Sequence, residues 1–274
     1  MNCLERVYDI ASLVQTEPVP GSTYHLIWVA AVLIFCAFVC VVVRYLGDMT
    51  FRRITLILWI VMLLFEVYKQ TVGNLDVANG EVVYRYSWEN FPFQLCSTPL
   101  YVLPFLALLK DGSVRDFFAS YTMTYALIGG IAVYMFPNSV FGEYVIGNVQ
   151  TMVHHGIQIA TGVMTAVRYR KRLDWRFFLK GLAVFILMFC IAMSLNTFGR
   201  DYLISVGAIT DGDTFNMFLI SPYMEFHYPV FGDVLQMLSP WTMVGLYFVG
   251  LPVGAALVMA MFKKFFDEKT KSKK

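Results

Sequence analysis

The amino-acid sequence predicts an all-α, polytopic membrane protein built as a bundle of seven transmembrane helices. Three observations support this fold class. Of the 274 residues, 58% are hydrophobic and only 15% are charged, which is too little charge for the water-facing surface of an ordinary soluble domain. The high apolar content also excludes a disordered chain. The charged residues gather in short clusters between long uncharged runs, and these runs are long enough to cross about 30 Å of hydrocarbon as helices.

The first two predicted spans are 24–46 and 51–72. Residues 26–43 are the clearest membrane segment, because their only polar atoms belong to two cysteines and one indole. The third span, 91–109, contains Pro92, Pro99 and Pro104. Proline removes a backbone donor, so we expect this span to be bent or broken, which membrane helices tolerate where they line a cavity.

The remaining predicted spans are 116–136, 146–168, 177–198 and 239–262. The fourth and fifth are nearly as apolar as the first, although the fifth contains two histidines. The seventh is required by the distribution of charge, because the basic clusters fall on one side of the membrane only if the chain crosses seven times.

The basic residues predict the orientation. Loops after odd-numbered spans and the C-terminal tail hold seventeen of the 21 lysines and arginines. By the positive-inside rule these loops are cytoplasmic and the N-terminus lies outside. We therefore expect a single multi-pass domain, 1–274, in the cell membrane, with a short outer segment at 1–23 and a basic cytoplasmic tail at 263–274. We expect no cleavable signal peptide, because residues 1–20 carry charge and lack an apolar core.

Several functional classes find no support in the sequence. It contains no Walker loop, no dinucleotide-binding glycine motif and no HExxH. The five cysteines are odd in number, and no pair has the spacing of a zinc ribbon. We accordingly predict no cofactor, no resident metal and no nucleic-acid partner, and the oligomeric state stays open.

Polar side chains inside the spans collect near the predicted outer surface, and polar groups within a membrane are functional candidates by default. They indicate one outward-opening polar cavity. They are His25, Glu66, Lys69, Gln70, Gln94, Cys96, Asn148, Gln150, His154, His155 and Asn196.

The fifth span separates its two histidines by face. Adjacent helical residues point about 100° apart, so only one histidine can share the polar stripe of this helix. His155 falls on an apolar stripe with Met152 and Ile159, and His154 is therefore the better candidate for chemistry. The polar stripe is Thr151, His154, Gln158, Thr161 and Thr165.

Cys96 and His154 lie at similar depth on neighbouring spans, where they could form a nucleophile–base pair. Structural alternatives remain open for each candidate. Cys96 could be a small buried hydrophobe, and Glu66 could simply pair with Lys69, three residues away. His25 could cap the first span, and Gln158 could hydrogen-bond between helices.

Several segments carry a resemblance to a known family. FPFQLCSTPLYVLP at Phe91–Pro104 resembles the YwaF-like bacterial integral membrane proteins, which belong with the transmembrane protein 164 acyltransferase family. The resemblance continues at TYHLIW around His25 and at His154–His155. It returns at NMFLI, Asn216–Ile220, and at LQMLSPW, Leu235–Trp241. Ser239 departs from the family pattern, which has glycine before the Pro-Trp pair.

The resemblance implies acyl transfer between membrane phospholipids without coenzyme A. It assigns Cys96 as the nucleophile and the His154–His155 pair as the source of the base. We predict substrate-binding roles for a further set of polar residues, and Gln94, Asn148 or Asn196 as donors to the developing oxyanion. The substrate-binding set is His25, Glu66, Gln94, Gln158, Asn196 and Asn216.

Two alternatives belong to other classes. A transporter or solute-binding membrane protein with an outward-facing polar cavity would use Glu66, His154, Gln158 and Asn196 to coordinate a polar solute or a proton. A non-catalytic receptor or assembly partner would need none of these side chains for chemistry.

Overall fold

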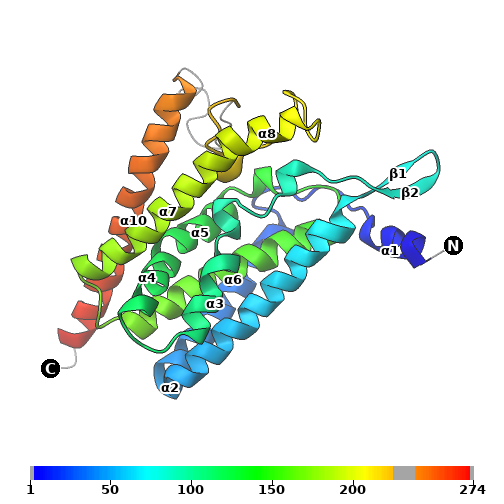
Figure 1. The fold of residues 1–274 in the computed structure, drawn as a ribbon. Coiled ribbons are helices and arrows are strands. Elements are labelled where there is room, and N and C mark those ends of the chain that lie inside the picture. Colours follow the sequence, from blue (N-terminus) through cyan, green and yellow to red (C-terminus); the bar gives the residue numbers. More distant parts are fainter. Residues whose placement is uncertain (1–2, 225–237, 272–274) are drawn as a thin grey trace.

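The computed structural model describes residues 3–224 and 238–271 and is predominantly helical. In Figure 1, helix α1 (Cys3–Ala11) and the hairpin of β1 (Leu75–Ala78) and β2 (Glu81–Tyr84) lie at one end of the bundle, here called the hairpin end. The C-terminus lies at the other end, here called the basic end. Residues 235–237 of the LQMLSPW motif and 272–274 of the basic tail lie outside the described residues.

Within the described residues, four helical stretches are long and apolar enough to cross a membrane: Thr23–Asn74, Ser113–Met135, Trp175–Ser205 and Pro240–Lys269. This confirms a protein with membrane-spanning helices. The number of seven spans and the orientation of the termini stay predictions.

Helix α2 (Thr23–Thr71) contains both of the first two predicted spans. Gly47, with φ of 79° and ψ of −172°, interrupts it and separates two arms. The ring of His25, in the first turn, packs 5.9 Å from the ring of Phe141, and Lys69, in the last turn, lines a cavity with the same Phe141. The arms therefore return to the hairpin end, and Gly47 supplies a left-handed backbone conformation that other residues rarely adopt.

The third predicted span is broken, as its prolines indicated. Residues Leu95–Ser97 form a 3-10 turn, and helix α3 comprises only Pro99–Leu108. Pro99 stands in the first turn, where its missing N–H costs nothing. The Tyr101 hydroxyl donates to the Pro92 carbonyl oxygen over 2.7 Å and closes the segment before the helix.

The fourth predicted span is continuous from helix α4 (Ser113–Tyr121) to α5 (Leu127–Met135), through a π-helical segment at Thr122–Ala126. Helices α6 (Val145–Tyr169) and α7 (Trp175–Ser194) follow. A second π-helical segment, Leu195–Gly199, joins α7 to α8 (Arg200–Ser205), and α10 (Pro240–Lys271) is the last helix. The buried core lies between these helices and includes Tyr121, Tyr125 and Phe185, whose rings stack.

Two elements were not predicted. The β1–β2 hairpin departs from the all-α class; its turn is Asn79-Gly80, and both residues have positive φ, as a two-residue hairpin turn requires. Helix α1 places Leu4, Val7 and Tyr8 at helical spacing on the predicted outer segment.

Helix α6 packs closely on α5, and this approach predicts a stability effect. A Cβ at Gly162 would lie only 2.7 Å from the Leu127 Cβ. We expect Gly162→Val to destabilise the protein by about 1–3 kcal/mol through overpacking, measured as thermal unfolding of the detergent-solubilised protein. Gly245→Val on α10 is the control, because no described atom lies within 4 Å of a Cβ there. Equal losses in both variants would contradict close α5–α6 packing.

Charged side chains at the basic end form a network through three aspartates. Arg115 is fully buried and donates to Asp48, which also pairs with Arg168. The Arg172 guanidinium bonds Asp111 and holds the pKa of that carboxyl below its usual value. Asp116 pairs with both Arg172 and Lys180. This network ties α2, α4, α6 and α7 together at the basic end.

Candidate functional site

Cys96 lies in the 3-10 turn that precedes α3 and is half-buried. The turn is fastened by Thr98, which is completely buried. The Thr98 hydroxyl donates to the Leu95 carbonyl over 2.7 Å and accepts from the Tyr121 hydroxyl over 2.9 Å. The prolines that break the third span thus leave the cysteine at the start of a helix, on a backbone held by the next helix.

Helix α6 contacts the turn through two side chains on one face. The Nε2 atoms of His154 and Gln158 each donate to the Cys96 carbonyl oxygen over 2.8 Å. A carbonyl only accepts, so the His154 proton is on Nε2 and its Nδ1 carries the free lone pair. That Nδ1 is buried and has no partner among the described residues. His154 can therefore accept a proton without giving up its hold on the turn.

In His155 the roles of the two ring nitrogens are reversed. Its Nδ1 donates to the Thr151 carbonyl oxygen over 2.7 Å, one turn earlier on α6, so its Nε2 carries the lone pair. This Nε2 is likewise buried without a partner among the described residues. The ring centroids of the two histidines are 5.4 Å apart. The site therefore holds two neutral imidazoles, each with one unused acceptor.

A polar cluster on the second arm of α2 completes the surroundings. Glu66 is buried, and its Oε1 accepts from Lys69 Nζ over 2.9 Å and from Gln70 Nε2 over 2.7 Å. Its Oε2 is buried and has no partner among the described residues. Lys69 is therefore paired with Glu66, as one of the structural alternatives anticipated.

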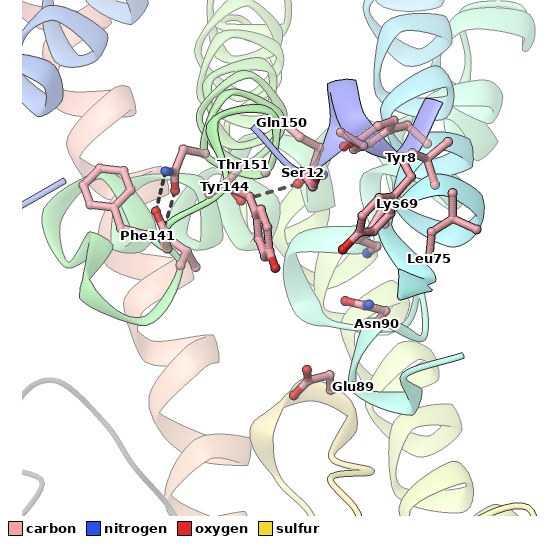
Figure 2. Close-up of a pocket in the computed structure, with 18 residues that line it drawn as sticks. Tyr8, Ser12, Lys69, Leu75, Glu89, Asn90, Phe141, Tyr144, Gln150 and Thr151 are labelled. Carbon is pink, nitrogen blue, oxygen red and sulfur yellow. Dashed lines mark hydrogen bonds between the residues drawn. The ribbon is translucent and has the colours of Figure 1, made fainter. Parts of the chain in front are cut away.

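A cavity of about 500 Å³ opens at the hairpin end beside the Glu66–Lys69 pair. Lys69 lines it, and so does Thr151, whose carbonyl binds His155. Figure 2 shows α1 bordering the cavity next to α6, with Leu75 of β1, Glu89 and Asn90 from the segment after β2, and Phe141 from the loop after α5 around the rest. The labelled lining residues are Tyr8, Ser12, Lys69, Leu75, Glu89, Asn90, Phe141, Tyr144, Gln150 and Thr151.

Other predicted site residues bind backbone groups. His25 accepts from the Gly21 amide and donates to the Tyr134 carbonyl, so both ring nitrogens are engaged. The Asn196 side chain bonds both the amide and the carbonyl of Met217.

The remaining amides also lie against backbone. Gln94 Nε2 donates to the Asn216 carbonyl over 2.8 Å, and the Asn216 side chain accepts from the Ser221 amide. Asn148 bonds the amide and the carbonyl of Gly142. The structure therefore brings Cys96, His154, His155 and Gln158 together and places the Glu66–Lys69 pair at the neighbouring cavity. The side chains of His25, Asn196 and Asn216 fasten neighbouring backbone.

Sequence reasoning missed part of the cavity wall. Tyr8 and Ser12 come from the unpredicted α1 segment, and Tyr144 precedes α6. The apolar spacing of Leu4, Val7 and Tyr8 was the available signal for an amphipathic helix at this position.

Comparison with known proteins gives one family match. The model of the TMEM164 family matches residues 21–263. No curated protein matches the chain, and no solved structure does. The matched range includes α2, the Cys96 turn and the histidine pair of α6.

Proposed function

The chain belongs to the TMEM164 family, and we propose that it is a membrane-embedded, cysteine-dependent acyltransferase that remodels glycerophospholipids without coenzyme A. We assign it to the YwaF-like bacterial branch on the motifs quoted above. One observation supports the proposal: a half-buried cysteine stands on a fastened turn whose carbonyl oxygen is bound by His154. One buried ring nitrogen of His154 and one of the adjacent His155 have no partner among the described residues.

The first half-reaction forms a thioester. A histidine lone pair takes the proton of the Cys96 thiol, and the thiolate attacks the ester carbonyl carbon of a phospholipid. The carbon–oxygen bond of the ester then breaks, and the departing glycerol oxygen takes the proton back from the imidazolium. The products are the acyl-enzyme and a lysophospholipid, with every proton accounted for.

The second half-reaction transfers the acyl group. The hydroxyl of an incoming lysophospholipid gives its proton to the same histidine and attacks the thioester carbon. The carbon–sulfur bond breaks, and Cys96 regains its proton. The cavity beside Lys69 at the hairpin end holds the polar headgroup.

We further propose seven spans with the basic end cytoplasmic, so that the reaction takes place in the outer leaflet of the cell membrane. Two arms of α2, the broken third span and four further helical spans make up the seven. The clustering of basic residues at one end supports this orientation under the positive-inside rule.

Direct assay tests the proposal. Purified protein is reconstituted into vesicles with a phospholipid that carries an isotopically labelled acyl chain and with an unlabelled lysophospholipid. We expect label in the acceptor without coenzyme A, and inhibition by a membrane-permeant thiol-alkylating reagent. Absence of transfer over a range of headgroups, or full transfer after Cys96 has been alkylated, would remove the proposal.

The identity of the base has its own prediction. His154→Gln keeps an N–H donor for the Cys96 carbonyl but cannot accept a proton, so we expect acyl transfer to fall by about 10²–10⁴-fold. Thermal stability should change little. His155→Gln is the matched variant and is expected to retain most activity. A larger loss in His155→Gln would assign the base to His155, and full activity in both would exclude a histidine base.

A transporter or solute-binding protein is the second candidate. It is favoured by Glu66, whose Oε1 binds Lys69 at the cavity wall and whose buried Oε2 has no partner among the described residues. Such a carboxylate suits a coordinating or proton-binding site. The two functions separate by mutation: a transporter would tolerate Cys96→Ser and lose uptake with Glu66→Gln, whereas the acyltransferase would lose its activity with Cys96→Ser.

A further inference from the structure

A second cavity, of about 610 Å³, lies at the basic end, away from the cysteine. Three distant segments form it: the end of the first arm of α2, the loop between α6 and α7, and the C-terminal part of α10. We call it the basic basin. Its cationic lining consists of Arg44, Arg170, Lys171, Arg172, Lys263 and Lys269.

Of the basin cations, Arg172 is paired with Asp111 and Asp116. Three others, Arg44, Lys171 and Lys263, differ from the cations packed inside the same end of the bundle. The interior cations Arg115, Arg168 and Lys180 are each bonded to an aspartate. By contrast, no ion pair within 4.0 Å joins Arg44 or Lys171 to a described carboxylate. The same holds for Lys263.

The acidic residues of the basin offset only part of this excess. Asp174 and Asp267 line the cavity together with the six cations, so the lining keeps a net positive charge. The positive-inside rule explains why these cations lie on one side of the membrane. It does not explain why cations from three separate segments line the same cavity.

Exposed aromatic rings lie beside the basin. Tyr45, next to Arg44, is 75% exposed, and Trp175, one residue beyond Asp174, is 63% exposed. Lys269 lies 4.3 Å from the centroid of the half-exposed Phe265 ring. Tyrosine and tryptophan are typical of the membrane–water interface. The position of these rings therefore indicates that the basin lies at the depth of the lipid headgroups.

We propose that the basic basin binds the phosphate of an anionic phospholipid headgroup. Guanidinium groups bind phosphate oxygens in pairs, and lysines add point charges. Arg44, Lys171 and Lys263, which form no ion pair with a described carboxylate, fit such a lipid. So do an open cavity and interfacial aromatic rings, if the headgroup enters from the membrane side. This site is separate from the acyl-transfer cavity, and the proposal does not depend on the proposed function.

The test measures lipid retention by the full-length protein. Protein in nanodiscs of phosphatidylcholine with one-fifth phosphatidylglycerol is extracted into mild detergent, and bound lipid is measured by native mass spectrometry. We expect phosphatidylglycerol to be retained over phosphatidylcholine. We also expect Arg44→Gln/Lys263→Gln to reduce its affinity by about tenfold or more, because each cation near an anionic headgroup contributes to binding.

The matched control is Arg176→Gln/Lys264→Gln, which removes the same charge at the same end. Neither residue lines the basin, and Lys264 pairs with Glu268. Equal loss in both double variants would show a diffuse surface charge and overturn the proposal. Equal retention of phosphatidylcholine would also overturn it. Displacement of the lipid by millimolar inorganic phosphate would reassign the basin to free anions.

Discussion

Cys96→Ala is expected to abolish acyl transfer, lowering the rate by about 10³-fold or more, because the covalent intermediate cannot form without the thiol. Cys96 is half-buried, so truncation by one sulfur atom leaves no large cavity and should change stability little. The measurement is intact-protein mass spectrometry after incubation with a phospholipid donor: the native protein should gain the mass of one acyl chain, removable by hydroxylamine.

The matched control is Cys190→Ala, which removes an exposed cysteine of α7. It should transfer acyl groups like the native protein. Persistence of the acyl adduct in Cys96→Ala, or its loss in Cys190→Ala, would remove Cys96 from the mechanism. Recovery of a folded but inactive Cys96→Ala protein is the result that separates catalysis from folding.

Asp48→Asn is expected to destabilise the protein by about 3 kcal/mol. Asp48 neutralises Arg115, which is 0% exposed, and also contacts Arg168. Removing one partner of a buried ion pair leaves an uncompensated charge, which costs about 3–5 kcal/mol. Partial exposure of Asp48 places the estimate at the lower end. Thermal unfolding in detergent measures the loss.

Asp76→Asn is the control for this variant. Asp76 pairs with Arg85 over 3.4 Å, but both side chains are at least half exposed, and exposed pairs contribute little. We expect a change of less than about 1 kcal/mol there. A similar loss of stability in both variants would contradict the interpretation that Asp48 stabilises the basic end by pairing with Arg115 and Arg168.

The helical framework could be predicted from the hydrophobic runs and the prolines of the sequence. Pro92, Pro99 and Pro104 predicted a broken span, and the structure has a 3-10 turn and a short helix there. The polar stripe of the fifth span likewise predicted that His154 and Gln158 share a face, and both contact the same atom. Periodicity determines which residues share a face, and proline determines where backbone donors are missing.

The hydrogen-bond partners of the polar side chains could not be predicted in the same way. A polar residue in a membrane span needs a hydrogen-bond partner, but its sequence does not reveal whether that partner is substrate or backbone. His25 and Asn196 both bind backbone. The positive-inside rule uses only lysine and arginine, so it gives no information on Asp48. In the structure Asp48 bonds Arg115 and Arg168, which are 67 and 120 residues away along the chain. The Asn79-Gly80 pair, in contrast, is a sequence signal that is typical of a hairpin turn.

The atom that His154 and Gln158 of α6 bind is the main-chain carbonyl oxygen of residue 96. This oxygen is present whatever amino acid occupies position 96. His154 and Gln158 consequently cannot distinguish cysteine from serine or alanine there. The scaffold and the reactive group are therefore free to diverge independently. A relative with another side chain in place of the thiol should keep this architecture. It should catalyse a different reaction, or none, at the same site.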